Sequence, residues 1–120
     1  MQTGTIRIKD LTLRAIIGIN DWERKKSQDI IINIEMEYNA QKAVETDDIA
    51  FALDYKTITK KIISEVGKTK FYLLEKLTAH ILRIIMKNNA VLTAAVRVDK
   101  PHALRYSESV SFKLSETRKK

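Results

Sequence analysis

The sequence contains no cysteine, which excludes disulfides, thiolate metal sites and cysteine nucleophiles. It has only 2 histidines, so a metal site built from histidines alone is nearly excluded as well. Glycine and proline number 3 and 1, too few for a collagen-like or low-complexity chain. No apolar run approaches the roughly 20 residues of a membrane-spanning helix, and the first four residues lack the features of a signal peptide. We therefore expect a cytoplasmic protein with no membrane partner.

The chain does contain enough apolar residues for a core, and an excess of positive charge. At 120 residues and 44% hydrophobic content, residues 1–120 are predicted to form a single domain. The 22 basic and 15 acidic residues give a net charge of +7, which favours an anionic partner such as nucleic acid or a phosphorylated metabolite. The basic residues are scattered and form no stripe interleaved with aromatics, so we predict no nucleic-acid partner. A small basic nucleic-acid binder stays as an alternative, whose affinity would fall steeply with salt.

Four segments alternate between apolar and polar residues with the period of a β-strand. In the first, Ile6 and Ile8 share one parity and Leu11 and Leu13 the other. The change falls at Asp10, which predicts a bulge or strand break there. The other three segments cover residues 30–38, 92–98 and 110–114, and the third segment is predicted to end at Pro101 because proline cannot donate to a sheet. In that third segment, the apolar set is Leu92, Ala94, Val96 and Val98.

Two helical segments lie between the second and third strands. One has an apolar stripe with Asp54 as N-cap and Gly67 as stop, made of Ile58, Ile62, Ile63 and Val66. The other runs from about Tyr72 to Lys87 with a broader apolar face. The order ββααββ predicts an α+β fold, in which two helices cover one face of a four-stranded antiparallel sheet.

The second face of that sheet is predicted to be polar, lined by Asn33, Glu35, Glu37, Arg97, Asp99, Ser111 and Lys113. The edge strands would have unpaired backbone groups. Either basic side chains protect these edges, or neighbouring subunits pair with them and build a ring with a polar lumen. Periodicity alone does not decide between the two.

Four polar residues lie at element ends, where sheet enzymes place functional groups: Glu23, Tyr55, Glu75 and Lys100. Each also has a structural explanation. Glu23 would belong to a solvated charged loop, and Tyr55 would be a packing residue. Glu75 would interact favourably with the helix dipole, and Lys100 would be a protective charge on an edge strand. His102, in a loop beside Lys100 and Arg105, is a better candidate than His80, which we expect to be exposed or fully hydrogen-bonded. Trp22 is more typical of a packing anchor than of a ligand platform.

The common catalytic motifs are missing. The sequence has no phosphate-binding glycine loop, no nucleophile elbow and no zinc-binding His-Glu-x-x-His. We therefore expect that an enzyme of this sequence uses no metal and no cofactor, and works with a lysine, carboxylates, a tyrosine and His102.

Six stretches in this order resemble the dihydroneopterin aldolase family over essentially the whole chain. They are Ile17-Gly18-Ile19, Asp21-Trp22-Glu23-Arg24 with Gln28, Asp47-Asp48-Ile49, Ala52-Leu53-Asp54-Tyr55, Phe71-Tyr72-Leu73-Leu74-Glu75-Lys76-Leu77 and Val98-Asp99-Lys100-Pro101-His102-Ala103-Leu104-Arg105-Tyr106. Residues 102–111 look most like the dihydroneopterin triphosphate 2′-epimerases of that family, whereas residues 21–24 look more like the aldolases proper. The resemblance implies the tunnelling fold, with a homo-octamer of two stacked tetrameric rings and sites between subunits.

The same resemblance implies roles for individual residues. Glu75 would bind the pterin ring through a bidentate pair, with backbone groups near Leu74 reading the rest of that edge. Lys100 would be the proton shuttle, and Glu23 would contact the substrate side chain or hold Lys100. Tyr55 of a neighbouring subunit would orient or protonate the side-chain carbons. His102 and Arg105 would contact phosphate or the side chain in the epimerase-like branch.

The implied activity acts on 7,8-dihydroneopterin or its triphosphate, in folate or tetrahydromonapterin metabolism. Retro-aldol cleavage would give 6-hydroxymethyl-7,8-dihydropterin and glycolaldehyde, and re-addition would give the 2′-epimer, dihydromonapterin. The alternative of a different class is a non-catalytic tunnelling-fold subunit that binds a pterin or purine.

Overall fold

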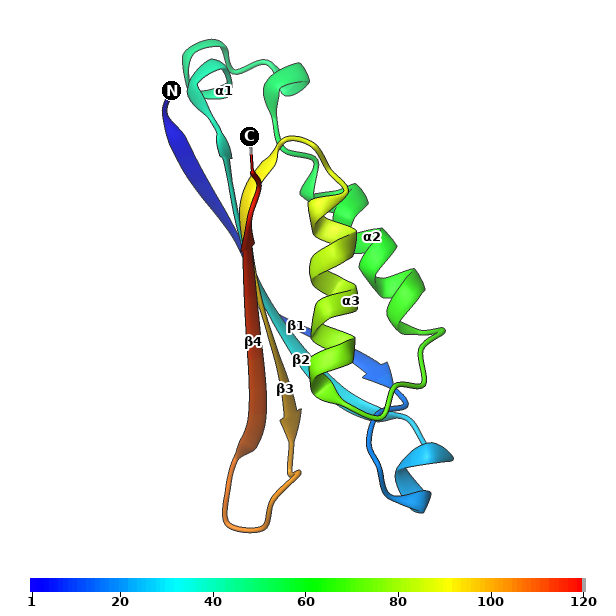
Figure 1. Ribbon diagram of the computed structural model, residues 1–120. Helices are drawn as coiled ribbons and strands as arrows, with labels where there is room; N and C mark the ends of the chain where they lie inside the picture. The colour runs from blue at the N-terminus through cyan, green and yellow to red at the C-terminus, as the bar shows by residue number, and fades with distance from the viewer. Residues whose placement is uncertain (120) are drawn as a thin grey trace.

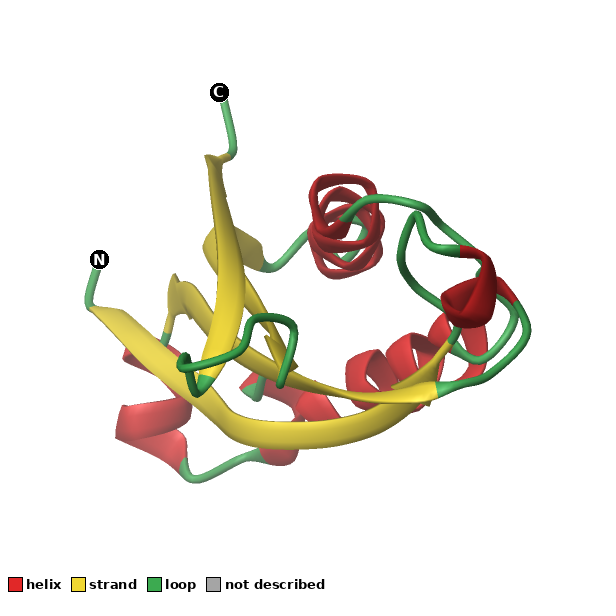
Figure 2. Cartoon of the chain, turned by 90° about the horizontal axis from the view of Figure 1, so that it is seen from below, coloured by secondary structure: helices red, strands yellow, loops and turns green. Residues whose placement is uncertain are grey.

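The computed structural model describes residues 1–119, and its centre is a twisted antiparallel sheet with helices on one face (Figures 1 and 2). The strands are β1 (Thr3–Ala15), β2 (Gln28–Asn39), β3 (Val91–Pro101) and β4 (Ser109–Thr117), paired in chain order. The helices α2 (Tyr55–Val66) and α3 (Leu74–Met86) lie between β2 and β3 in the chain. The predicted α+β class and the order ββααββ are confirmed.

The irregularity predicted in the first strand is a β-bulge. Ile8 pairs with Ile34 and Leu11 with Ile32, so β1 has an extra residue between these pairs. Asp10 takes a positive φ of 54°, and its N–H donates to Asn33 Oδ1 at 3.0 Å. The bulge keeps the apolar residues before and after it on the same face of the sheet.

The core lies between the sheet and the two long helices. The Asp54 carboxylate accepts a hydrogen bond from the Thr57 N–H at 3.0 Å, and Gly67 follows the last residue of α2, so both predicted ends of that helix are confirmed. Ile63 was predicted in the buried stripe, but 46% of its surface is exposed. It follows Ile62 by 100° around the helix, which turns it away from the sheet.

Two further details differ from the sequence prediction. Leu73 is the N-cap of α3 in an extended conformation, so this helix begins two residues later than predicted. At the start of β3, Val91 is buried in place of Leu92, because the register shifts so that Tyr38 pairs with Val91 and Glu37 with Thr93. This second bulge has no signal in the alternation of residues 92–98.

Three short helices were not predicted. They are the 3-10 helix η1 (Asp21–Arg24), the helix α1 (Gln41–Thr46) and the 3-10 helix η2 (Ile49–Phe51). No residue of α1 or η2 is buried, and at 6 and 3 residues both are too short to repeat the apolar stripe that marks a helix in a sequence.

The topology brings three segments to the same end of the sheet (Figure 1). They are the loop between β1 and β2 with η1, the end of β3, and the N-terminus of α3. The N-terminus of α2, which carries Tyr55, is the end of that helix that lies farther from these three segments (Figure 1). No helix of the described residues is long and apolar enough to cross a membrane.

Candidate active site

The carboxylate of Glu23 is the centre of a buried polar cluster. Glu23 lies on η1 and only 2% of its surface is exposed. Its Oε1 accepts hydrogen bonds from the backbone N–H of Asn20 at 3.1 Å and from the side-chain amide of Asn20 at 2.8 Å. Its Oε2 accepts from the Gln28 amide at 3.1 Å and forms an ion pair with the Nζ of Lys100. A buried carboxylate is tolerated here because both of its oxygens are satisfied.

These partners determine the charge state of Glu23. Burial acts to raise the pKa of this carboxyl, because it penalises the charged form. Hydrogen bonds from Lys100, Gln28 and the Asn20 backbone, together with the positive charge of Lys100, outweigh burial and lower the pKa from 4.5 to about 2. Glu23 is therefore ionised at neutral pH.

Lys100 lies near the C-terminal end of β3, and from there its side chain reaches Glu23. Its side chain is 14% exposed and lies on the helix-covered side of the sheet, as does Val110 opposite it on β4. Pro101 ends the strand, and His102 follows with a positive φ of 61°. The His102 N–H donates to the carbonyl of Glu108 at 3.1 Å, which closes the loop between β3 and β4.

Arg24 joins the loop after β1 to the segment before α3. Its guanidinium donates to the carbonyls of Gly18 at 3.2 Å and Phe71 at 3.0 Å, and also to the carbonyl of Lys70. It stacks over the ring of Tyr72 at 4.0 Å from the ring centre. The planar fork of arginine suits this set of acceptors, because its several N–H groups point to different carbonyls at once.

A pocket of about 200 Å³ opens at this cluster. Its floor carries Glu23 and Lys100, and its remaining lining residues are Gly18, Ile19, Asn20, Trp22, Gln28, Tyr72, His102 and Ala103. Trp22 and Tyr72 are 63% and 62% exposed, so each presents an aromatic surface at the pocket. Trp22 is therefore not the packing anchor predicted from the sequence. No group of three or more metal-ligating side chains occurs within residues 1–119.

The family model for dihydroneopterin aldolase (FolB) matches residues 6–115 of this chain. The chain belongs to the dihydroneopterin aldolase family. Within that family it is 53% identical to the dihydroneopterin triphosphate 2′-epimerase of Pseudomonas aeruginosa, over 92% of this chain and 89% of the relative. It is 50% identical to the Escherichia coli K12 protein of the same name, over 92% of both chains. Its identity to the dihydroneopterin aldolase of Haemophilus influenzae is 28%, over 86% of this chain and 87% of that one.

Solved structures of the family share the fold. A putative dihydroneopterin aldolase from Vibrio cholerae superimposes with a TM-score of 0.92 at 26% identity. The match covers 98% of this chain and 100% of the V. cholerae chain. The E. coli dihydroneopterin aldolase in complex with neopterin gives a TM-score of 0.88 at 25% identity, covering 94% and 98% of the two chains. The predicted family and tunnelling-type fold of the single chain are confirmed.

The structure brings some of the predicted site residues together and leaves others apart. Glu23, Lys100 and His102 line one pocket. Glu75 and Leu74 lie in the first turn of α3, at the same end of the molecule (Figure 1).

Tyr55 and Arg105 are not part of that pocket. Tyr55 is the first residue of α2, whose 12 residues span about 18 Å, and it is 45% exposed. Arg105 is exposed in the loop between β3 and β4, with its guanidinium over the ring of Tyr106 at 5.6 Å. The assignments of all these residues to substrate stay predictions.

The sequence argument missed the residues that hold Glu23 in place. Asn20 caps η1, and Glu23 stands three residues later, which is the spacing of a capping box and was a usable signal. Gln28 was named only as part of the family resemblance and without a role, because its partners Ile17 and Glu23 are close to it only after folding. The prediction for His80 is wrong: it packs edge-on against Phe71, and its Nε2 is buried with no hydrogen-bond partner within the described residues.

Proposed function

We propose that this chain acts on the side chain of 7,8-dihydroneopterin or its triphosphate by retro-aldol and aldol chemistry. The observation that carries this proposal is the Glu23–Lys100 ion pair on the floor of a pocket flanked by exposed aromatics. A membership in the dihydroneopterin aldolase family supports the same substrate class. So does the neopterin bound to the E. coli aldolase.

The N-terminus of α3 is the proposed site for the pterin ring. Glu75 is exposed there, and its two oxygens match the two adjacent N–H donors of a 2-amino-4-oxo ring. Leu73, the N-cap residue, has no side chain that accepts from the backbone, so the first N–H groups of the helix are available. Those N–H groups, near Leu74, suit the oxygen of the pterin ring, and Trp22 and Tyr72 offer aromatic surfaces at the pocket that contains Lys100.

Lys100 is the proposed proton shuttle. Removal of the proton from the 2′-hydroxyl allows the C1′–C2′ bond to break, with its electrons moving from C1′ into the C6=N5 imine to give an enamine. Glycolaldehyde leaves with C2′ as its carbonyl carbon. The ionised Glu23 fixes the position of the Lys100 Nζ at this step.

Two products are available from the enamine. Protonation of C1′ gives 6-hydroxymethyl-7,8-dihydropterin, whereas re-addition to glycolaldehyde after it has turned over inverts C2′. A tenfold preference between these outcomes corresponds to only about 1.4 kcal/mol in barrier height. We infer that 2′-epimerisation is favoured, because the epimerases are 50% and 53% identical to this chain whereas the H. influenzae aldolase is 28% identical.

The position of Tyr55 supports a site shared between subunits. Tyr55 begins α2, at the end of that helix that lies farther from the C-terminal end of β3 (Figure 1), so we propose that Tyr55 acts in the pocket of a neighbouring subunit. The edge strands β1 and β4 each have one unpaired side, which suits edge-to-edge pairing into the proposed ring and octamer. His102, at the pocket, and Arg105, in the same loop, are proposed to contact the substrate's phosphates.

A product assay tests the proposal. The protein is incubated with 7,8-dihydroneopterin and, separately, with its triphosphate, and the pterins are separated by chromatography. We expect the 2′-epimer, dihydromonapterin or its triphosphate, as the main product. Hydroxymethyldihydropterin as the main product would make the protein an aldolase, and no conversion by a folded protein that binds pterin would favour the non-catalytic subunit.

A further inference from the structure

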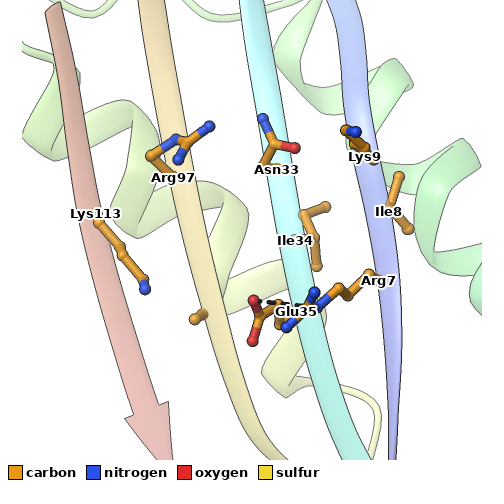
Figure 3. A pocket seen from close by; sticks show the side chains of 9 residues that line it. Arg7, Ile8, Lys9, Asn33, Ile34, Glu35, Arg97 and Lys113 are labelled. Atoms are coloured by element: carbon orange, nitrogen blue, oxygen red, sulfur yellow. Dashed lines mark ion pairs between the residues drawn. The ribbon is translucent and has the colours of Figure 1, made fainter.

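The open face of the sheet carries a second hollow, which shares no residue with the pocket at Lys100. Its volume is about 330 Å³, and it is lined by Arg7, Ile8, Lys9, Asn33, Ile34, Glu35, Ala95, Arg97 and Lys113 (Figure 3). Four of these nine residues are cations and one is a carboxylate. The lining residues therefore have a formal net charge of +3, before the carboxylates of Asp10 and Asp99, which contact Asn33 and Arg97, are counted.

Strand register places three of the cations in one row across the sheet. Asn33 on β2 pairs with Arg97 on β3, and Arg97 pairs with Lys113 on β4. Lys9 stands in the β1 bulge next to Asn33. Neighbouring strands are about 4.8 Å apart, so the row runs from Lys9 to Lys113 over about 14 Å.

The chain itself neutralises the row only in part. The Asn33 side chain donates to Asp10 Oδ1 at 3.1 Å, which places one carboxylate in the row. Glu35 already pairs with Arg7 at 3.3 Å, and Asp99 with the Nε of Arg97 at 2.9 Å. Within residues 1–119, neither Lys9 nor Lys113 forms an ion pair. Like charges directly opposite each other on neighbouring strands, as Arg97 and Lys113 are, destabilise a sheet. A bound anion would remove that cost.

We propose that this row is a binding site for a small oligophosphate. A single phosphate cannot contact cations at both ends of the row, whereas a chain of linked phosphates has several anionic groups in line. The terminal N–H groups of Arg97 fit a phosphate oxygen pair, and Lys9 and Lys113 add point charges on either side. The site is separate from the proposed catalytic pocket, so it does not depend on the proposed function.

Calorimetric titration of the full chain at constant ionic strength tests the site. The probes are tripolyphosphate, pyrophosphate and inorganic phosphate. We expect tripolyphosphate to bind at least tenfold more tightly than inorganic phosphate. Lys113→Ser should weaken tripolyphosphate binding at least fivefold, and Lys9→Ser should do the same. Lys60→Ser, which removes the same charge from an exposed position on α2, is the matched control and should leave the affinity unchanged.

Thermal unfolding provides a second readout. Without oligophosphate, Lys113→Ser should melt at the same temperature as the wild type or higher, because one of two opposed cations is gone. With saturating tripolyphosphate the order should reverse, since only the wild type gains the full stabilisation from binding.

Several outcomes would overturn the proposal. Equal affinity in the wild type and both lysine variants would place any binding elsewhere, including the catalytic pocket. If tripolyphosphate binds no more tightly than inorganic phosphate, the row attracts anions only through its general positive charge and is not an oligophosphate site. Tighter binding of a single-stranded oligonucleotide than of tripolyphosphate, at the same salt concentration, would indicate a nucleic-acid surface instead.

Discussion

Gly18 lies directly against the carboxylate of Glu23. A Cβ atom at position 18 would fall 2.2 Å from the carboxyl carbon of Glu23 and 2.3 Å from its Oε2, far inside contact distance. Gly18 also takes a φ of +133°, which residues with a Cβ rarely adopt. Since the carboxylate is held by Asn20, Gln28 and Lys100, it cannot move aside. A glycine at this position is thus a requirement of the site and not only of the loop.

Gly18→Ala should lower the free energy of unfolding by about 2–4 kcal/mol, through both backbone strain and displacement of Glu23. Gly67→Ala is the control, because Gly67 has a φ of −61° and a Cβ there would meet nothing closer than 3.5 Å. That control should change stability by less than about 1 kcal/mol, in the stabilising direction. Chemical denaturation measures both, and equal effects in the two variants would contradict this account of Gly18.

Glu23→Gln should lower the free energy of unfolding in a pH-dependent way. The pKa of Glu23 falls from 4.5 to about 2 on folding, so its ionised form stabilises the folded state by about 3 kcal/mol at pH 7. This stabilisation is complete above pH 4.5 and disappears as the pH falls through 4.5 toward 2, because the unfolded state then binds the proton first. Urea denaturation of the wild type and variant from pH 7 to pH 2.5 should show the difference between them shrinking.

The control for that series is Glu116→Gln, an exposed carboxylate with no ion pair within the described residues. It should show a small difference at every pH. A difference between the wild type and Glu23→Gln that stays constant from pH 7 to pH 2.5 would mean that the hydrogen bonds to Glu23 do not depend on its charge.

Arg24→Ala should loosen the connection between the loop after β1 and the start of α3. The carbonyls of Gly18, Lys70 and Phe71 each lose a donor, although Phe71 still accepts from the Gly18 N–H, and we expect a loss of about 1–3 kcal/mol in stability. Amide hydrogen exchange should speed up in residues 18–24 and 68–73 before the core of the sheet is affected. Arg14→Ala removes a surface ion pair with Asp29 and should cost at most about 1 kcal/mol, so it serves as the control.

Glu75→Ala should lose affinity for the pterin ring while the protein stays folded. Glu75 is exposed, and its contribution to stability through the helix dipole is a few tenths to about 1 kcal/mol. Removal of a bidentate, charge-assisted pair should weaken neopterin binding at least tenfold in a fluorescence titration. Lys76→Ala, also exposed in the first turn of α3, is the matched control. Unchanged neopterin affinity in Glu75→Ala would remove Glu75 from the proposed site.

Two inactive variants should restore activity when their subunits are mixed. Lys100→Ala and Tyr55→Phe are each expected to be inactive in the product assay. If Tyr55 acts in the pocket of a neighbouring subunit, oligomers reassembled from unfolded mixtures contain some sites with both wild-type residues. About a quarter of wild-type activity is the expected maximum at equal amounts, by simple probability. Activity that stays at the level of the separate variants would place Tyr55 outside the shared site.

Local sequence patterns were sufficient to predict the fold class and the main element boundaries. The period-two alternation of residues 30–38 and 110–114, the switch at Asp10 and the Asp54 cap are local patterns, and the structure places strands, the bulge and the α2 N-terminus there. Such features depend on neighbours along the chain, so they can be read before any tertiary contact is known. The exposed helices α1 and η2 escaped prediction because they bury nothing.

The contacts between the chemically active groups depend on long-range packing and could not be predicted from local patterns. Glu23 and Lys100 are 77 residues apart, and their ion pair exists because the loop after β1 and the end of β3 reach the same end of the sheet. The partners Asn20 and Gln28, the close approach of Gly18 and the carbonyls held by Arg24 likewise depend on that arrangement. The cationic row on the open face depends on strand register, which pairs Arg97 with Lys113. A sequence pattern carries the period of a strand, but contacts between distant segments follow from how the strands and loops pack together.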